Sequence, residues 1–184
     1  MRWLSLFALL LFIPLSGCAI NSAPATYMVE TEGPYTLDTG DVLRVFVYGD
    51  DQISNQYMVD DNGSIAFPLV GPISVRGQTT QLAAARITAA LANGFMRNPN
   101  VAVEIATYRP FFIQGEVINS GQFPYVYGMT IRAAISTAGG FTDTADRTRV
   151  TIYRPNGDQM IKGNIELDFP VRPGDTIVVL DRWL

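Results

Sequence analysis

The sequence has no histidine and a single cysteine, Cys18, among its 184 residues. Catalytic triads that need an imidazole are therefore excluded, and a lone thiol cannot form an intramolecular disulfide. No set of cysteines and histidines stands at zinc-binding spacing. The composition argues against hydrolases built on His or Cys, and it predicts neither a metal nor a cofactor.

Charge is also scarce. Charged residues make up 16% of the chain, and the net charge is −4. No basic run and no stripe of basic and aromatic residues is present. Nucleic-acid-binding domains concentrate Lys and Arg in such features, so no nucleic-acid partner is predicted.

The chain lacks a long hydrophobic run. Its apolar stretch 3–15 follows Arg2 and is interrupted only by Ser5 and Pro14. A membrane-spanning helix needs about 20 residues, whereas a positive residue before a short apolar core is typical of a secretory signal. We therefore interpret residues 1–17 as a signal peptide.

Leu15-Ser-Gly-Cys18 ends this signal and resembles the lipobox of bacterial lipoproteins. The resemblance implies cleavage before Cys18, lipid attachment to it, and membrane anchoring by the acyl chains. Residues 18–34 then form the lipidated N-terminus and a tether. Ala19 stands where an Asp would retain a lipoprotein at the inner membrane, which favours the outer membrane.

One short phrase occurs twice. Gly40-Asp41 and Gly174-Asp175 each have an aliphatic residue three positions before the glycine and an apolar strand directly after the aspartate. The glycines can adopt a positive φ, and the aspartates can accept hydrogen bonds from nearby backbone N–H groups. The repeat suggests two small modules that contain β-strands.

Residues 35–108 form the first predicted domain, with the order β-β-β-α-β. Asn62-Gly63 lies between β-type runs at 56–60 and 64–70 and predicts a hairpin that joins them. Pro68 should make the second run an edge or a bend, and a further short strand at 73–75 is left open. A helix from Thr79-Thr80 to about 93–94 is expected before a strand at 101–108. The expected packing face of this helix consists of Ala84, Ile87, Leu91 and Phe95.

Residues 109–184 form the second predicted domain, β-β-α-β-β-β, with one helix across a mixed sheet. Strands are expected at 111–118, 123–127, 149–154 and near 160–161, and after Gly174. Gly115 permits a bulge or a close backbone approach. The helix should begin at Thr130 and end at Gly139-Gly140. The fold class is α+β with two small domains of about 75 residues, which should lean on each other or on neighbouring subunits.

Several motifs suggest chemistry, and each has a simpler structural explanation. Asp60-Asp-Asn-Gly63 lacks the first carboxylate and the final Glu of a calcium loop, so a hairpin turn is preferred. Asp50-Asp51 is interpreted as a solvated pair rather than a glycosidase pair. Gly139-Gly140 lacks the lysine of a phosphate loop. Three aromatic residues could stack on sugars, although packing is the simpler account: Phe123, Tyr125 and Tyr127.

The ordered set of motifs resembles the outer-membrane polysaccharide export family of Wza-type lipoproteins. The segments 35–47, 59–75 and 99–103 resemble its export domain, and 114–117, Gly121, 138–140 and 172–178 resemble its soluble-ligand-binding β-grasp (SLBB) repeat. The positions that carry the family motifs are Gly40, Asp41, Gly63, Pro68, Gly71, Gly115, Gly121, Gly139, Gly140, Pro173, Gly174 and Asp175.

The resemblance implies transport rather than catalysis. It implies a homo-oligomeric collar at the periplasmic side of the outer membrane, through which exopolysaccharide or capsule polymer passes. An inner-membrane polysaccharide co-polymerase is the implied partner. Family members with a built-in pore carry a C-terminal helix, whereas this sequence ends at Arg182-Trp-Leu184 after a strand. We therefore expect a short form that works with a separate outer-membrane pore protein.

Two other functions stay open at this point. A monomeric periplasmic lipoprotein could bind a soluble glycan through its β-grasp domain. An enzyme acting on cell-wall glycan is the weakest alternative, because the sequence lacks histidine and a free thiol, and Asp50-Asp51 would have to act as its carboxylates.

Overall fold

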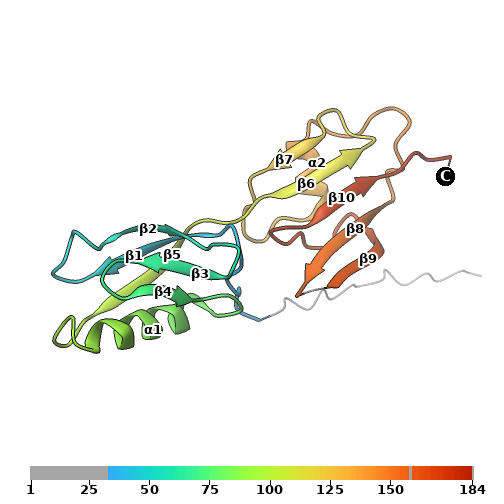
Figure 1. Cartoon of the computed structure of the whole chain (residues 1–184). Coiled ribbons are helices and arrows are strands. Elements are labelled where there is room, and N and C mark those ends of the chain that lie inside the picture. Colours follow the sequence, from blue (N-terminus) through green and yellow to red (C-terminus); the bar gives the residue numbers. More distant parts are fainter. Residues whose placement is uncertain (1–32, 158, 184) are drawn as a thin grey trace, which may run out of the picture. The chain divides into compact units, whose positions relative to one another are not determined.

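The computed structural model describes residues 33–157 and 159–183 (Figure 1). The predicted signal peptide 1–17 and the lipid attachment at Cys18 lie outside the described residues. Within these residues the chain forms two helices and three sheets, which are three-stranded, five-stranded and two-stranded. The predicted α+β class is confirmed.

The first group of elements is a small sheet, a hairpin and a helix. In the three-stranded sheet the central strand β1 pairs antiparallel with β2 and with β5. The hairpin β3–β4 forms a separate two-stranded sheet. The elements are β1 (Val42–Val47), β2 (Asn55–Met58), β3 (Ser64–Phe67), β4 (Gly71–Ser74), α1 (Thr80–Ala92) and β5 (Val101–Thr107).

Alternation along β1 builds the first core. Leu43, Val45 and Val47 are buried, and the residues between them are exposed, as the two-residue period of a strand requires. Thr79 caps α1 by accepting a hydrogen bond from Leu82 N at 3.3 Å. The helix buries Ala83, Ile87 and Leu91 in the same cluster.

The predicted packing face of α1 is correct at Ile87 and Leu91 and wrong at both ends. At the first end, Ala83 is buried and the predicted Ala84 is only half-buried. The helix stops at Ala92, and Phe95 lies beyond it with 51% of its surface exposed. The asparagine-glycine pair that follows the helix turns the chain away from the helical path, so the 3.6-residue spacing no longer places position 95 on the packing face.

The predicted hairpin between β2 and β3 is also wrong. A turn does form at Gly63, whose N–H donates to Asp60 O at 3.0 Å. However, β2 pairs with β1, and β3 pairs with β4, the short strand that the sequence had left open. The chain bends at Pro68, directly after β3. The Asn-Gly turn therefore carries the chain from one sheet to another.

The second group of elements forms the five-stranded sheet, in the order β7-β6-β10-β8-β9. The last strand, β10, inserts between β6 and β8 and is parallel to β6, whereas all other pairs are antiparallel. The elements are β6 (Phe111–Gly115), β7 (Gly121–Phe123), α2 (Ile131–Thr137), β8 (Arg149–Asn156), β9 (Gln159–Glu166) and β10 (Thr176–Val179). The order of the elements along the chain matches the predicted β-β-α-β-β-β, but the second strand, expected at 123–127, lies at 121–123.

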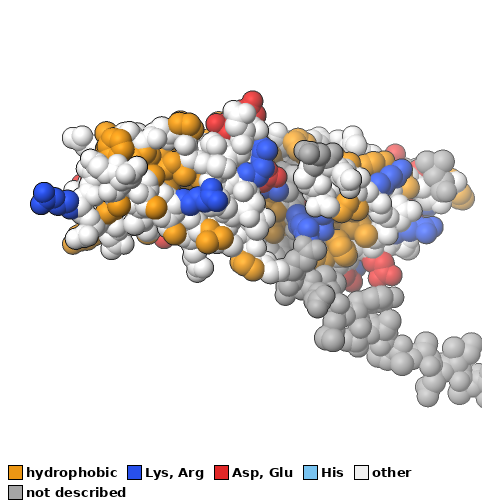
Figure 2. Space-filling view, turned by 60° about the horizontal axis from the view of Figure 1, so that its bottom comes forward, with side chains coloured by type: hydrophobic (Ala, Val, Ile, Leu, Met, Phe, Trp, Pro, Cys, Tyr) orange, Lys and Arg blue, Asp and Glu red, His pale blue; other side chains and the backbone are white. Residues whose placement is uncertain are grey.

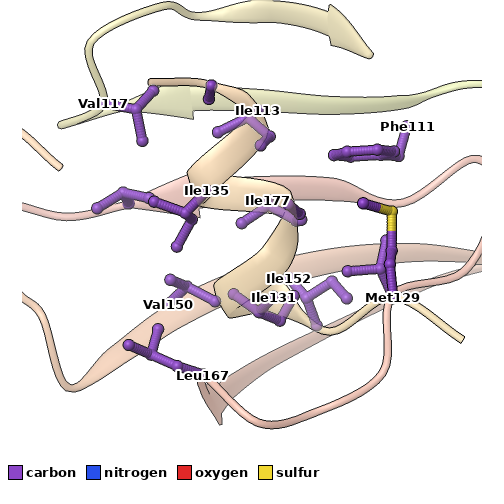
Figure 3. Packing of buried hydrophobic residues seen from close by; sticks show 14 of the residues in the cluster. Phe111, Ile113, Val117, Met129, Ile131, Ile135, Val150, Ile152, Leu167 and Ile177 are labelled. Carbon is purple, nitrogen blue, oxygen red and sulfur yellow. The ribbon is translucent and has the colours of Figure 1, made fainter. Parts of the chain in front are cut away.

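The helix α2 packs across one face of this sheet (Figure 3). Ile131 and Ile135 point from the helix toward Ile177, Ile152 and neighbouring strand residues. Full burial of each such side chain stabilises by roughly 1.5–3 kcal/mol relative to exposure. The opposite face of the same sheet carries no helix in the described part of the chain.

Neither α1 nor α2 is long and apolar enough to cross a membrane, and they are the only helices among the described residues.

Candidate functional site

The two Gly-Asp phrases fold into the same turn. The φ angles of Gly40 and Gly174 are 90° and 87°, a region that costs other residues strain. In each turn the aspartate N–H donates to the carbonyl three residues earlier at 3.1 Å. In each turn, too, the glycine N–H donates to the adjacent segment and the aspartate carbonyl accepts from it. The sequence repeat is therefore a structural repeat.

The carboxylate of Asp41 is fully buried and saturated with donors. Its Oδ2 accepts from Tyr35 OH at 2.7 Å and from Asp38 N at 2.9 Å. Arg109 donates its backbone N–H to Oδ1 at 2.9 Å, and its guanidinium lies 3.3 Å from Oδ2. The strand β1 thus starts from a turn that is tied to the end of β5.

The carboxylate of Asp175 has an equivalent environment. Arg154 donates from Nε and Nη2 to its two oxygens at 2.9 and 2.8 Å, the bidentate geometry that a guanidinium favours. Arg172 N donates at 2.6 Å. The guanidinium of Arg154 also lies over the ring of Phe169, 5.4 Å from its centroid. This turn positions β10 at the centre of the sheet.

These turns are chemically closed. Both aspartates are 0% exposed, so neither oxygen pair can reach a substrate. Burial, with the hydrogen bond to Asp41 as a second cause, raises the pKa of the Tyr35 hydroxyl far above its usual value of 10.0. The hydroxyl therefore stays protonated and keeps donating. The arrangement holds strands in place and offers no general acid or base.

The arginine partners were not identified from the sequence. Arg109, Arg154 and Tyr35 lie 68, 21 and 6 positions from the aspartates they contact. A buried aspartate needs a cation or several hydrogen-bond donors nearby. This requirement predicts that each aspartate has a partner. The sequence does not show which arginine meets it.

Two other motif glycines are required by close approach. A Cβ on Gly63 would lie 2.5 Å from Arg76 Cβ, and Arg76 itself donates to Asp61 O at 2.7 Å across the turn. A Cβ on Gly115 would lie 2.1 Å from Val179 O, at the end of the parallel β6–β10 pair. The remaining motif residues lie in turns or at strand ends: Pro68, Gly71, Gly121, Gly139, Gly140 and Pro173.

The candidate acidic motifs lie in loops. Asp50 accepts from Gln52 N at 3.0 Å within its own turn, and its neighbour Asp51 is exposed. Asp60 uses Oδ1 to accept from Ser64 N at 2.8 Å. Among the described residues no group of three acidic, His or Cys side chains is placed to hold a metal ion. A shallow hollow over β1 and β2 is lined by residues that include Arg44, Phe46 and Gln56.

Of the three aromatic residues considered for sugar stacking, Phe123 and Tyr125 contact other rings, whereas Tyr127 is exposed. Phe123 stacks on Phe111 with ring centroids 5.9 Å apart, so it is a packing residue. Tyr125 packs edge-on against Tyr108, with ring centroids 5.3 Å apart, and Tyr127 is 71% exposed.

Figure 2 shows one face of the described residues, on which Lys and Arg side chains are dispersed among hydrophobic and uncharged ones.

The chain matches two families in sequence. The family described as polysaccharide biosynthesis/export protein matches residues 29–106, and the SLBB domain family matches residues 110–162. The first match covers the turn at Asp41 and the core built on β1. The second begins beside Phe111, covers α2 and β8, and ends within β9.

Similar proteins carry related names. The exopolysaccharide production protein ExoF of Rhizobium meliloti (strain 1021) is 36% identical over 114 residues, 60% of this chain and 27% of that protein. The EPS I polysaccharide export outer membrane protein EpsA of Ralstonia solanacearum is 30% identical over 148 residues, 66% of this chain and 39% of that protein. The polysialic acid transport protein KpsD of Escherichia coli is 27% identical over 174 residues, which are 88% of this chain and 31% of that protein.

The chain thus spans well under half the length of these relatives. The polysaccharide export match precedes the SLBB match, which is the order that the motifs predicted. The three relatives are named for polysaccharide production, export or transport. The chain belongs to the polysaccharide biosynthesis/export family and carries its export domain followed by an SLBB domain.

Proposed function

We propose that this protein is a component of a polysaccharide export system at the outer membrane. The observation that carries the proposal is the ordered match of the two families over 29–106 and 110–162. Relatives named for export of an extracellular polysaccharide and for transport of polysialic acid point to the same role. The polymer would be an exopolysaccharide or a capsule.

The proposed working form is a homo-oligomeric collar through which polymer passes. Two small hydrophobic clusters, one around β1 and one around β10, are each near the lower size limit for independent stability. The outer strands of both larger sheets are unpaired on one side within the described residues, and such edges are available to neighbouring subunits. A closed ring with head-to-tail contacts would use them.

The proposal involves transport without catalysis, since the buried aspartates offer no reactive group. The polymer would come from an inner-membrane co-polymerase, and Cys18 would carry the lipid that holds the protein at the outer membrane. The co-polymerase partner and the lipid attachment are both inferred from the sequence.

Deletion of the gene tests the function. Secreted polymer should fall to background, and re-expression of the full chain should restore it. Electron microscopy of the purified full chain in detergent should show rings. Undiminished export in the deletion strain would refute the export role, and a stable monomer at micromolar concentration would favour a monomeric glycan-binding protein.

Replacement of the proposed lipid site tests the anchor. A Cys18→Ser variant should move from the membrane to the periplasmic fraction, while a Ser16→Ala variant should stay with the membrane. Membrane retention of Cys18→Ser would contradict lipid anchoring.

A further inference from the structure

The five-stranded sheet has one face that α2 does not cover. Strand alternation sends Phe111, Ile113, Ile177 and their neighbours to the helix side, and the residues between them to the other side. We call this second side the open face and define it by two rows of residues. The first row is Gln122, Phe112, Thr176, Tyr153 and Lys162, and the second is Gln114, Val178, Thr151 and Asn164.

The register aligns each row across the strands. Phe112 pairs with Gln122 on one side and with Thr176 on the other, and Thr176 pairs with Tyr153. Neighbouring strands are about 4.8 Å apart, so the two aromatic residues stand about 10 Å apart with a threonine between them. The two aromatic residues and the threonine therefore lie in one row across β6, β10 and β8.

Phe112 is the exposed ring of this row. Its side chain is 42% exposed, and it stacks on no other aromatic ring among the described residues, whereas its neighbour Phe111 is fully buried. A phenylalanine at this position gains little from burial. Tyr153 is half-buried, with Lys162 Nζ 5.3 Å from its ring centroid.

The polar groups around the rings are mostly unengaged. The side chains of Gln114, Gln122 and Thr176 make no hydrogen bond to the rest of the described chain, whereas Thr151 donates to Asn164 Oδ1 at 2.8 Å. Amides and hydroxyls both donate and accept. They can therefore complement the hydroxyl groups of a sugar, whose C–H faces stack on aromatic rings.

The charge of the open face limits which class of ligand it can bind. The two rows contain no carboxylate and one cation, Lys162, and the paired Arg149 and Glu166 of β8 and β9 extend the same side of the sheet with charges of opposite sign. Such a face does not repel acidic polymers and accommodates neutral ones. A protein partner is less suited, because the buried core of a protein interface is more apolar than the rest of the surface, whereas six of the nine residues in the two rows carry an amide, a threonine hydroxyl or an ammonium group.

We propose that the open face is a binding surface for the polysaccharide chain, with Phe112 as the stacking platform. This inference rests on the proposed export function, since it names the surface that the transported polymer contacts. Weak stacking with exchangeable hydrogen bonds would guide a moving polymer without trapping it.

Calorimetric titration of the full chain in detergent tests the open face. The probes are oligosaccharides from partial hydrolysis of the host strain's secreted polysaccharide. Phe112→Ala should weaken binding about tenfold, and Phe112→Trp should retain it. Phe95→Ala is the matched control, because Phe95 is 51% exposed and follows α1 in the first group of elements. It should leave the dissociation constant within about twofold.

Three results would overturn the inference. They are no measurable binding by the unmodified chain, equal binding by Phe112→Ala, or an equal loss in Phe95→Ala. A smaller oligomer for Phe112→Ala in native mass spectrometry would identify the open face as a contact between subunits and would also overturn it. Export in cells separates the two proposals: if the deletion abolishes secretion while the oligosaccharides do not bind, only the open-face inference fails.

Discussion

At the residue scale, the two Gly-Asp turns each depend on an ion pair whose aspartate is fully buried. Asp41 and Asp175 begin the two strands around which the cores form, and each is matched to an arginine. Their arginines differ in exposure: the Arg109 side chain is 20% exposed and that of Arg154 10%. Removing one partner of a buried pair leaves an uncompensated charge.

Asp175→Asn should therefore lower the free energy of unfolding by about 3 kcal/mol, because the buried Arg154 loses its counter-charge. Urea denaturation followed by circular dichroism measures the change. Asp168→Asn is the control, since its ion pair with Arg132 is exposed on both sides; it should cost less than about 1 kcal/mol. Equal losses in the two variants would contradict the distinction.

The Tyr35 hydroxyl makes stability depend on alkaline pH. Its folded-state pKa is raised by burial and by Asp41, so the stabilisation is complete below about pH 10 and is lost as the pH rises above that value. The unmodified chain should lose unfolding free energy between about pH 10 and pH 12 more steeply than Tyr35→Phe.

Urea titrations across this range measure the difference in slope. Tyr48→Phe, at a ring that is 85% exposed, is the control and should follow the unmodified chain. Parallel curves for Tyr35→Phe and the unmodified chain would show that the buried hydroxyl does not couple to folding.

At the scale of elements, the β3–β4 hairpin has an unusual tip. Leu69 has a φ of 69° and is 58% exposed. This left-handed conformation costs a non-glycine residue about 1–2 kcal/mol. An exposed leucine side chain also gains little hydrophobic stabilisation. Neither burial nor backbone preference within the described chain accounts for this residue.

Leu69→Asn should raise the free energy of unfolding by up to about 1 kcal/mol, because asparagine tolerates the left-handed region better. Thermal unfolding measures the effect. Leu82→Asn, at a 57% exposed position on α1, is the control and should be neutral or slightly destabilising. A clear loss of stability in Leu69→Asn would show that the side chain makes contacts that its exposure does not reveal.

At the scale of the whole molecule, the two hydrophobic clusters are small, and no disulfide supports either of them. If the protein assembles as proposed, association stabilises the folded chain by mass action. The melting temperature should then rise by several degrees for each tenfold increase in protein concentration, since this corresponds to about 1.4 kcal/mol in association.

Differential scanning calorimetry over a hundredfold concentration range checks this expectation, with sedimentation velocity at the same concentrations as the control for assembly. A constant melting temperature from a monomeric species would contradict the collar.

Local patterns were sufficient for much of the architecture. The alternation of Leu43, Val45 and Val47, the cap at Thr130 and the two Gly-Asp turns lie within short segments whose conformation depends on their own residues. Their positions and the α+β class could therefore be predicted, and the ordered motifs were enough to identify the family.

Pairing and partners were decided by tertiary packing. A two-residue period says which side chains share a face but not which strand lies alongside, so β2 was assigned to β3 although it pairs with β1. The parallel contact of β6 with β10 joins strands more than 60 positions apart. The open face around Phe112 and the arginines that close the Gly-Asp turns exist only once those distant segments meet, because their geometry depends on the assembled sheet.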